Sequence, residues 1–413
     1  MAHSAFESCR LSAVVAAAIG VLCGCASRDL VEPAPQEELG SQVSGVHMAE
    51  LSKDFGIVYL TNTAKDEVVA VDARSLSGDA SDDALLNRAY IVSRDSGELD
   101  VLDLRTLELS KIKNYGVLNR VSLGAHPTHL SLSRDGRLLA VMEEEEGSGA
   151  VSFVDARDMR ELKRLPGFFT PHFMRFAPDG RYGYVANLNA HHLTRVDLEK
   201  LEIDAQIPLD GFEAPPHEVL APDEGGFADA QIDAEGVLYA AHSATNRVLV
   251  YDTVKQRKLP ELPVGNRPWI VYAEHPFAEV RTHVVPNFGD RTVSLINGAA
   301  GDVTATIAAA DRESFGVNYS SLVANQAFVM NRFRKNITVV DTVRGEELDT
   351  IPVGGNTETA ATTRDGRWIV ATVSSANRVV VIDAVSHRVV KTFDDVGDYP
   401  WAVTIPKGQN YCH

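Results

Sequence analysis

The chain has 413 residues, about two to three times a typical domain length, so one small core cannot account for it. Apolar residues make up 45% and charged residues 23%, as in soluble globular chains. The formal net charge is −18. Such an acidic chain argues against nucleic acid as a partner and against docking on anionic lipid by charge alone, because both need a basic surface.

The N-terminus carries the features of a bacterial secretion signal. The apolar run from Leu11 to Leu22 is shorter than the roughly 20 residues that span a bilayer. It ends in the sequence LCGC at 22–25, which resembles the lipobox of bacterial lipoproteins. The resemblance implies cleavage before Cys25 and lipidation of its thiol. Residues 1–24 are therefore predicted to be a lipoprotein signal peptide.

Residues 25–50 are predicted to form the lipidated cysteine and a flexible tether, because they contain Pro33 and Pro35 and few large apolar side chains. No Asp follows Cys25, and by resemblance to lipoprotein sorting rules this favours the outer membrane. We expect the chain to be lipid-anchored on the periplasmic side of the envelope, with the membrane and a periplasmic protein as partners.

An internal repeat predicts the fold of residues 51–413. Short β-branched runs such as VSFVD and ITVVD recur, and each is followed by a polar turn. Eight copies end at Asp72, Asp103, Asp155, Asp197, Asp252, Asn297, Asp341 and Asp383, with spacings of 31, 52, 42, 55, 45, 44 and 42 residues. A period near 42–45 suits a four-stranded propeller blade. The prediction is an all-β chain, a seven- or eight-bladed β-propeller.

Two further registers accompany the repeat. Segments such as YVAN and FVMN place an asparagine ten residues before the terminal Asp, and Asp-Gly turns such as RDGR at 134–137 precede them. These motifs resemble the YVTN family of β-propellers over roughly residues 55–405. The resemblance implies a periplasmic propeller, related in structure to the haem-binding propeller of periplasmic nitrite reductases.

The C-terminus is expected to close the ring. Residues 401–406 have the pattern of an innermost strand with no later partners, and we predict that they pair with the N-terminal strands around 56–72. The first interval of 31 residues is too short for four strands. It indicates either a trimmed first blade or a ring of seven.

Propeller geometry gathers the histidines on one face. Loops between blades, and loops between second and third strands, lie opposite the Asp-Gly turns and carry seven histidines: His126, His129, His172, His191, His192, His217 and His242. Imidazole suits copper, zinc and haem iron, and aromatic walls suit a planar cofactor. The predicted cofactor-binding residues are His129, His172, His217, His242, Trp269 and Trp401. The predicted metal ligands are His126, His129, His172, His217, Cys412 and His413.

Structural roles compete with these predictions. His129 lies seven residues before its turn glycine and His172 lies eight before its own, so the alternation of a strand would point them apart. The pair Cys412 and His413 suits a soft metal but also a tail tucked under the closing blade. The acidic run 143–146 is expected to be a solvated loop tip, and the basic loop 332–335 to meet an anionic ligand or balance neighbouring acids.

The resulting hypothesis is a propeller that binds a metal, a haem-like cofactor or a protein partner at its histidine-rich face. The resemblance to nitrite reductases implies a haem ligand at His129, although Arg267-Pro268-Trp269 stands where a second active-site histidine is expected. No Cys-x-x-Cys-His is present, so the chain has no c-type haem motif of its own. Two alternatives stay open: a copper- or haem-dependent oxidoreductase, and a cofactor-free envelope scaffold. No catalytic residue is predicted.

Overall fold

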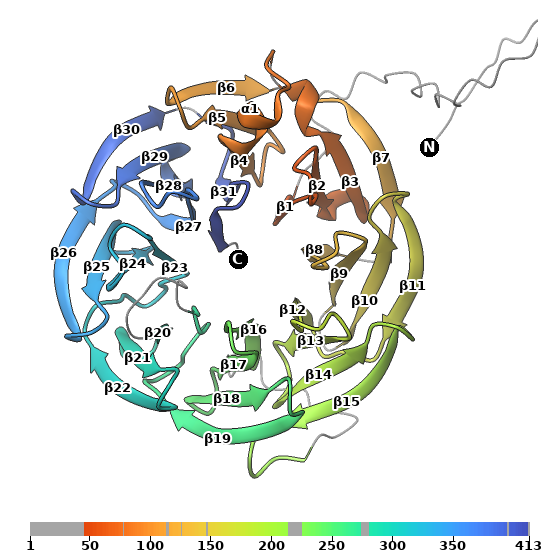
Figure 1. Cartoon of the computed structure of the whole chain (residues 1–413), viewed down its shortest axis with the longest axis vertical. Helices are drawn as coiled ribbons and strands as arrows, with labels where there is room; N and C mark the ends of the chain where they lie inside the picture. The colour runs from red at the N-terminus through yellow and green to blue at the C-terminus, as the bar shows by residue number, and fades with distance from the viewer. Residues whose placement is uncertain are drawn as a thin grey trace, which may run out of the picture. The chain divides into compact units, whose positions relative to one another are not determined.

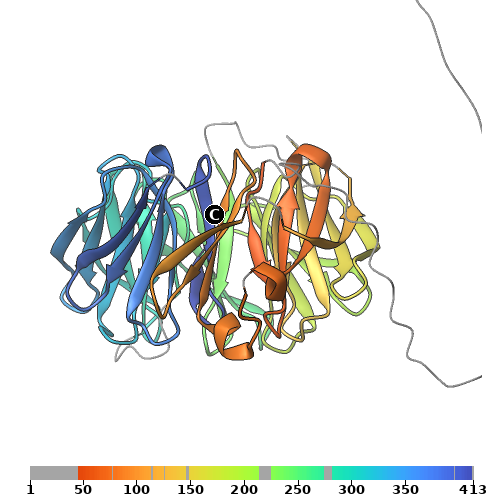
Figure 2. The same cartoon turned by 90° about the horizontal axis from the view of Figure 1, so that it is seen from above.

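The computed structural model describes residues 45–411 except 77, 113–114, 125, 146–147, 214–224, 274–280 and 395. Across this described part of the chain, the strands form eight sheets arranged as blades around a central axis (Figure 1). Figure 2 shows the strands of the blades running from one face of the ring to the other. The protein is thus an eight-bladed β-propeller, and the choice between seven and eight is settled.

We number the blades around the ring. Blade 1 contains β31 (Pro400–Thr404), β4 (Arg88–Ser93), β5 (Leu99–Asp103) and β6 (Glu108–Ile112), and blade 2 contains β1 (Ala49–Leu51), β2 (Ile57–Asn62), β3 (Glu67–Asp72) and β7 (Val117–Ser122). Blade 3 contains β8 (Pro127–Leu132), β9 (Leu138–Glu145), β10 (Ser148–Asp155) and β11 (Arg160–Pro166). Blade 4 contains β12 (Pro171–Phe176), β13 (Tyr182–Asn187), β14 (His192–Asp197) and β15 (Glu202–Pro208).

The other half of the ring follows the same plan. Blade 5 contains β16 (Phe227–Ile232), β17 (Val237–His242), β18 (Arg247–Asp252) and β19 (Arg257–Pro263). Blade 6 contains β20 (Thr282–Asn287), β21 (Thr292–Asn297) and β22 (Asp302–Ile307), with bridges from Pro268 and Tyr272 on its inner side. Blade 7 contains β23 (Gly316–Tyr319), β24 (Gln326–Asn331), β25 (Asn336–Asp341) and β26 (Glu346–Pro352). Blade 8 contains β27 (Thr357–Thr362), β28 (Trp368–Val373), β29 (Arg378–Asp383) and β30 (Arg388–Asp394), and β32 (Gln409–Tyr411) adds to β27.

The aspartate of each repeat has a local structural role. At the end of β10, Oδ1 of Asp155 accepts hydrogen bonds of 3.0 Å from the backbone N–H groups of Arg157 and Asp158. Asp252 makes the same pair of bonds to Val254 and Lys255. The carboxylate therefore holds the turn that starts the outermost strand, which explains why the repeat carries an acid there.

Ring closure differs from the prediction in its partner. The closing strand β31 pairs with β4, with Val403 opposite Ile91, and not with residues 56–72. The N-terminal strands already have an inner neighbour, because Ala49 of β1 pairs with Leu60 of β2. The chain crosses from β3 to β4–β6 of blade 1 and returns as β7 to complete blade 2. The C-terminal strand thus closes the ring, as predicted, one blade away from the predicted place.

This crossing explains the short first interval of the repeat. Blade 1 receives three strands from residues 88–112, and its innermost strand comes from the other end of the chain. The short helix α1 (Asp82–Leu86) lies in the connection, with Ser81 capping its N-terminus. The propeller also begins before residue 51, since Val46 is fully buried and β1 starts at Ala49. None of the helices among the described residues has the length and hydrophobicity that a membrane crossing requires.

Candidate functional site: a histidine pair at the channel mouth

His129 and His172 lie on the innermost strands of neighbouring blades, and the structure brings them together. Their ring centroids are 4.1 Å apart. Both side chains are more than nine-tenths buried. They sit at the ends of β8 and β12 that lie away from the Asp-Gly turns, which places them at one mouth of the channel lined by the inner strands.

A β-bulge in each strand offsets the difference in spacing between the two histidines, which lie seven and eight residues before their turn glycines. In β8, Pro127 pairs with Glu143 and His129 with Met142, so Thr128 is the extra residue. In β12, His172 itself is the extra residue between two paired neighbours. A bulge interrupts the alternation of side chains, so two residues one position apart converge from adjacent blades.

Hydrogen bonds to the Nδ1 atoms fix the tautomers of both rings. His129 Nδ1 lies 3.0 Å from Oε1 of Glu144 and 3.1 Å from Oγ1 of Thr128. His172 Nδ1 lies 2.8 Å from the backbone carbonyl oxygen of Ala228. A carboxylate and a carbonyl only accept, so both Nδ1 atoms carry the proton and both Nε2 lone pairs are available. Nε2 of His129 is buried without a hydrogen-bond partner among the described residues.

The charges of this cluster suit a cation. Burial, together with neighbouring His129, lowers the pKa of His172 to about 4, so its imidazole is neutral at pH 7. Burial favours the neutral acid of Glu144, but the adjacent imidazoles and the Thr128 hydroxyl outweigh it and hold the pKa of Glu144 below its ordinary range. One ligand atom from each of the three residues, His129, Glu144 and His172, lies within 4.8 Å of the others. Neutral imidazole and carboxylate are ligands that copper and zinc accept.

The prediction that the acidic run 143–146 is a solvated loop tip is wrong for Glu143 and Glu144. Glu143 is fully buried and pairs with Arg164, Nε to Oε2 at 2.7 Å, and Ser152 also donates to it. Oε1 of Glu144 lies 3.0 Å from Nδ1 of His129. A run of four glutamates contains no signal that separates these roles, so sequence reasoning missed Glu144.

His47 is a second residue that sequence reasoning missed. It precedes β1 and lay inside the predicted tether, whereas in the structure its backbone N–H donates to Oγ1 of Thr61 at 3.1 Å. Burial lowers the pKa of His47, and the charge of Glu144 opposes that shift. A third imidazole therefore lies in the electrostatic neighbourhood of the pair.

A row of aromatic rings continues from the pair around the mouth. His172 lies 6.3 Å from Trp269, measured between ring centroids, and Trp269 lies 5.9 Å from Phe315. Phe315 lies 6.5 Å from Trp401, which stacks on Tyr399 at 5.9 Å. The indole N–H groups of Trp269 and Trp401 are buried without a hydrogen-bond partner among the described residues. The two predicted tryptophans thus belong to the same mouth as the histidines.

His242 and His126 are not part of the pair. Nε2 of His242 lies 3.1 Å from Nδ1 of His191, which stacks on Phe212, so these residues form a separate contact between blades 4 and 5. His126 is exposed, and its backbone N–H donates to Asp66. Within the described residues, the group with metal-ligand geometry does not include either of them. His217, Cys412, His413 and Cys25 lie outside the described residues.

Arg332, in the basic loop after β24, is paired with neighbouring acids. Arg332 lies 3.1 Å from a carboxylate oxygen of buried Glu358 and 2.7 Å from one of Glu313. It also donates to the hydroxyl of Tyr399 at 2.9 Å. Of the two expected roles, balancing neighbouring acids describes Arg332. Arg94 contributes a further cation at the mouth, with its guanidinium carbon 4.0 Å from the Tyr399 ring centroid.

Fold and site together define an eight-bladed β-propeller with a histidine pair and aromatic side chains at one mouth of its channel. No protein-family profile matches the sequence, and no curated protein is significantly similar to it. Membership of the YVTN family therefore stays a prediction.

Solved structures share the propeller fold at low sequence identity. The periplasmic gluconolactonase of Pseudomonas aeruginosa is 16% identical, with a TM-score of 0.56 over 77% of this chain and 98% of that one. The hydrazine synthase of Kuenenia stuttgartiensis is 17% identical, with a TM-score of 0.53 over 85% and 99%. The dihydro-haem d1 dehydrogenase NirN is 15% identical, with a TM-score of 0.49 over 78% and 76%. At these identities the similarity establishes the fold alone.

Proposed function

We propose that this propeller binds a transition-metal ion at its channel mouth through Nε2 of His129 and Nε2 of His172. The observation that carries the proposal is that both Nδ1 atoms donate to oxygen, which leaves an Nε2 lone pair on each of two adjacent rings. Glu144 orients His129 and supplies the negative charge that compensates the ion. This is the carboxylate–histidine arrangement that commonly supports metal ligands.

Metal titration tests the proposal. The chain with Cys25→Ser, which cannot be lipidated there, is produced in the periplasm, stripped of metal and titrated calorimetrically with Zn²⁺ and Cu²⁺. We expect one equivalent to bind, and His129→Ala or His172→Ala to weaken binding by about 100-fold or more, since each removes a ligand.

His126→Asn is the matched control, because it removes an exposed histidine of the same loop and asparagine tolerates the positive φ of 48° found there. Its metal affinity is expected to equal that of the parent chain. If His126→Asn loses as much affinity as His129→Ala, or if the parent binds neither metal, the site is not the one proposed.

A haem-like cofactor is the second candidate, and the aromatic row favours it. Trp269, Phe315 and Trp401 offer ring faces beside the available Nε2 of His129, and Arg94 adds a cation for an anionic edge. Such a group, when bound, would supply redox chemistry, and an open coordination position would make the propeller an oxidoreductase.

Haem titration followed by absorption separates the two candidates. A bound macrocycle would give a shifted absorption band that His129→Ala abolishes and Trp269→Ala weakens. For a bare metal ion we expect no such band, and Trp269→Ala is expected to leave the Zn²⁺ affinity unchanged because its indole is not a ligand.

The lipid anchor and the periplasmic location are also proposals. They rest on the LCGC sequence, which lies outside the described residues. Metabolic labelling with radioactive palmitate tests the anchor. Label is expected to be lost in Cys25→Ser and retained in Cys23→Ser. The opposite result would show that Cys23, and not Cys25, is the lipidated residue.

A cofactor-free scaffold is the remaining alternative. It would need a continuous apolar surface for a partner. The large exposed apolar side chains include Leu118 on β7, Val254 after β18 and Val385 after β29. A co-purification of the anchored protein with an envelope partner that survives His129→Ala would favour this alternative over the metal site.

A further inference from the structure

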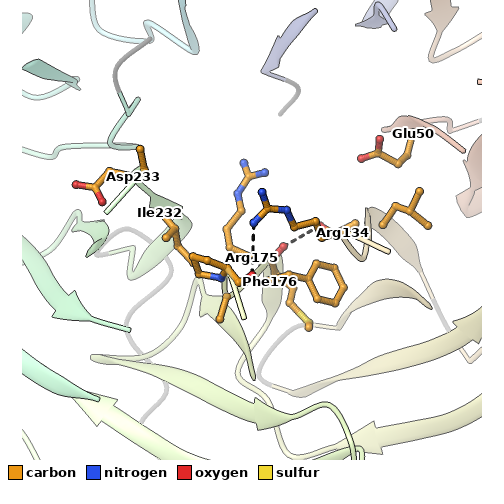
Figure 3. Close-up of a pocket in the computed structure, with 12 residues that line it drawn as sticks. Glu50, Arg134, Arg175, Phe176, Ile232 and Asp233 are labelled. Carbon is orange, nitrogen blue, oxygen red and sulfur yellow. Dashed lines mark hydrogen bonds between the residues drawn. The ribbon is translucent and has the colours of Figure 1, made fainter. Parts of the chain in front are cut away.

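A second site lies at the other end of the channel. A cavity of about 540 Å³ opens among the inner strands of blades 2 to 5, near the Asp-Gly turns (Figure 3). Ser131 lines it from β8, two residues beyond His129, which corresponds to about 7 Å along the strand. The cavity is therefore separate from the histidine pair. Its volume lies within the range typical of small-molecule sites.

Arg175 is held rigidly at the wall of this cavity. Its Nε and Nη2 atoms donate to the two carboxylate oxygens of fully buried Asp229, at 3.2 and 2.6 Å. Its guanidinium carbon also lies 4.1 Å from the ring centroid of Phe173. These contacts fix the plane of the guanidinium and leave Nη1 without a hydrogen-bond partner among the described residues. A pre-organised donor of this kind loses little entropy when it binds an acceptor.

Arg134 adds a second cation to the same wall. Its Nη1 atom donates to the carbonyl oxygen of Pro178 at 3.4 Å, and no carboxylate among the described residues lies within ion-pair distance of it. Figure 3 shows Arg134 and Arg175 reaching toward the open centre of the cavity, whereas Asp233 turns away from it. Asp233 faces Arg281 at 3.5 Å. Within the described part of the chain, the positive charge of Arg134 is thus not compensated by an acid.

Glu50 of β1 faces the two arginines from the opposite side in Figure 3. Its Oε1 accepts from the backbone N–H of Leu51 at 3.0 Å. Burial raises the pKa of Glu50 to about 7, although the charge of Arg175 opposes the shift. With Glu50 protonated, Asp229 balances Arg175 and Arg281 faces Asp233, so Arg134 is the lining cation that has no acid beside it among the described residues.

We infer that this cavity binds one small organic carboxylate. Arg134 and Nη1 of Arg175 would hold the carboxylate group, and the protonated Glu50 would face it without repulsion. Met174, Phe176 and Ile232 offer apolar contacts for the body of the ligand. A monoanion with an apolar part satisfies both halves of the lining, which inorganic anions do not.

The test uses benzoate as the probe and benzamide as its neutral analogue, on the Cys25→Ser chain. Ligand-observed NMR is expected to show saturable benzoate binding at pH 6, about tenfold tighter than benzamide, because the amide lacks the charge that guanidinium groups recognise. Arg134→Gln is expected to weaken benzoate binding about tenfold. Arg137→Gln, an exposed arginine of the same turn, is expected to have no effect.

Glu50→Gln supplies a second variant that does not remove a cation. The parent chain is expected to bind benzoate about tenfold more weakly at pH 8 than at pH 6, because the fraction of protonated Glu50 falls about tenfold across its pKa. Glu50→Gln is expected to bind equally at both pH values. Any of three results would overturn the inference, whatever the metal titrations show. These results are equal affinities for benzoate and benzamide, no saturable benzoate binding, and an unchanged benzoate affinity in Arg134→Gln.

Discussion

The imidazole of His129 lies 4.1 Å from that of His172, although the two residues occupy non-equivalent positions on their strands. By register, His172 corresponds to Thr128, and His129 corresponds to Phe173. The pair therefore does not follow from repetition of the blade. It forms because His172 lies in the bulge of β12, whereas His129 directly follows the bulge of β8. The pair is thus a local departure from the repeat at the channel mouth.

Glu144→Gln is expected to reduce zinc affinity by about 10- to 100-fold without unfolding the chain. The amide keeps the shape but removes the negative charge that holds the Nδ1–H of His129 and balances the ion. Isothermal calorimetry measures the affinity.

Glu143→Gln is the matched control, since Glu143 is the adjacent residue and pairs with Arg164 instead. It is expected to lower the free energy of unfolding by about 1–3 kcal/mol and to leave zinc affinity unchanged. The opposite pattern, with affinity lost in Glu143→Gln and kept in Glu144→Gln, would remove Glu144 from the site.

Acid is expected to destabilise the propeller through its buried histidines. Burial and neighbouring His191 lower the pKa of His192 to about 4, and both its ring nitrogens are buried without a hydrogen-bond partner among the described residues. Below pH 6.5 the unfolded chain binds a proton that the folded chain refuses, so the free energy of unfolding falls between pH 6.5 and 4.

His192→Leu removes this contribution. At pH 7 the free energy of unfolding of His192→Leu is expected to be equal to that of the parent or up to about 1 kcal/mol higher. At pH 4 this difference is expected to be larger by about 2–3 kcal/mol. Urea unfolding at the two pH values measures both differences. A difference that stays constant between pH 7 and pH 4 would show that His192 titrates normally in the folded chain.

The blades were predictable because each one needs the same turn chemistry. Asp155 and Asp252 each hold two backbone N–H groups where the third strand ends, so the acid recurs in the sequence with the blade period. Ring closure was less predictable. The strand β1 has three residues and none of the repeat features, yet it takes the inner position that would otherwise have received β31.

The residue types of the candidate site were predictable, but their geometry was not. His129, His172, Trp269 and Trp401 follow from their loops, because propeller topology brings loops of one kind to one face. The bulge that makes the two histidines meet depends on backbone register, which the alternation of a regular strand does not reveal. The separate position of His242 depends on His191, which binds it from the neighbouring blade.

Deletion of residues 398–413 is expected to prevent folding. It removes β31, whose five residues are all buried, and leaves β4 without its inner neighbour and the ring with an open edge. Size-exclusion chromatography is expected to show aggregates.

Deletion of Cys412 and His413 alone is the matched control. The shortened chain is expected to stay monodisperse, because β31 remains intact. The same chain tests the predicted metal ligands of the tail, since a loss of zinc affinity here would add them to the site. Folding of the chain without residues 398–413 would contradict the closure by β31.

Glu50→Gln is expected to stabilise the propeller at alkaline pH. Burial raises the pKa of Glu50 to about 7 from 4.5, so the folded chain holds a proton that the unfolded chain releases between these values. The contribution of Glu50 is fully present below pH 4.5 and is lost as the pH rises through 7. The free energy of unfolding of Glu50→Gln minus that of the parent is expected to be about 2 kcal/mol larger at pH 8 than at pH 4.5. Urea unfolding at the two pH values measures this difference. The control is Glu67→Gln, because Glu67 is a buried glutamate of blade 2 whose carboxylate accepts a hydrogen bond from Asn62. If Glu50→Gln and the parent change in parallel between pH 4.5 and pH 8, the pKa of Glu50 is the same in the folded and the unfolded chain. An ionised Glu50 would then face the cavity at neutral pH and repel the carboxylate that the cavity is inferred to bind.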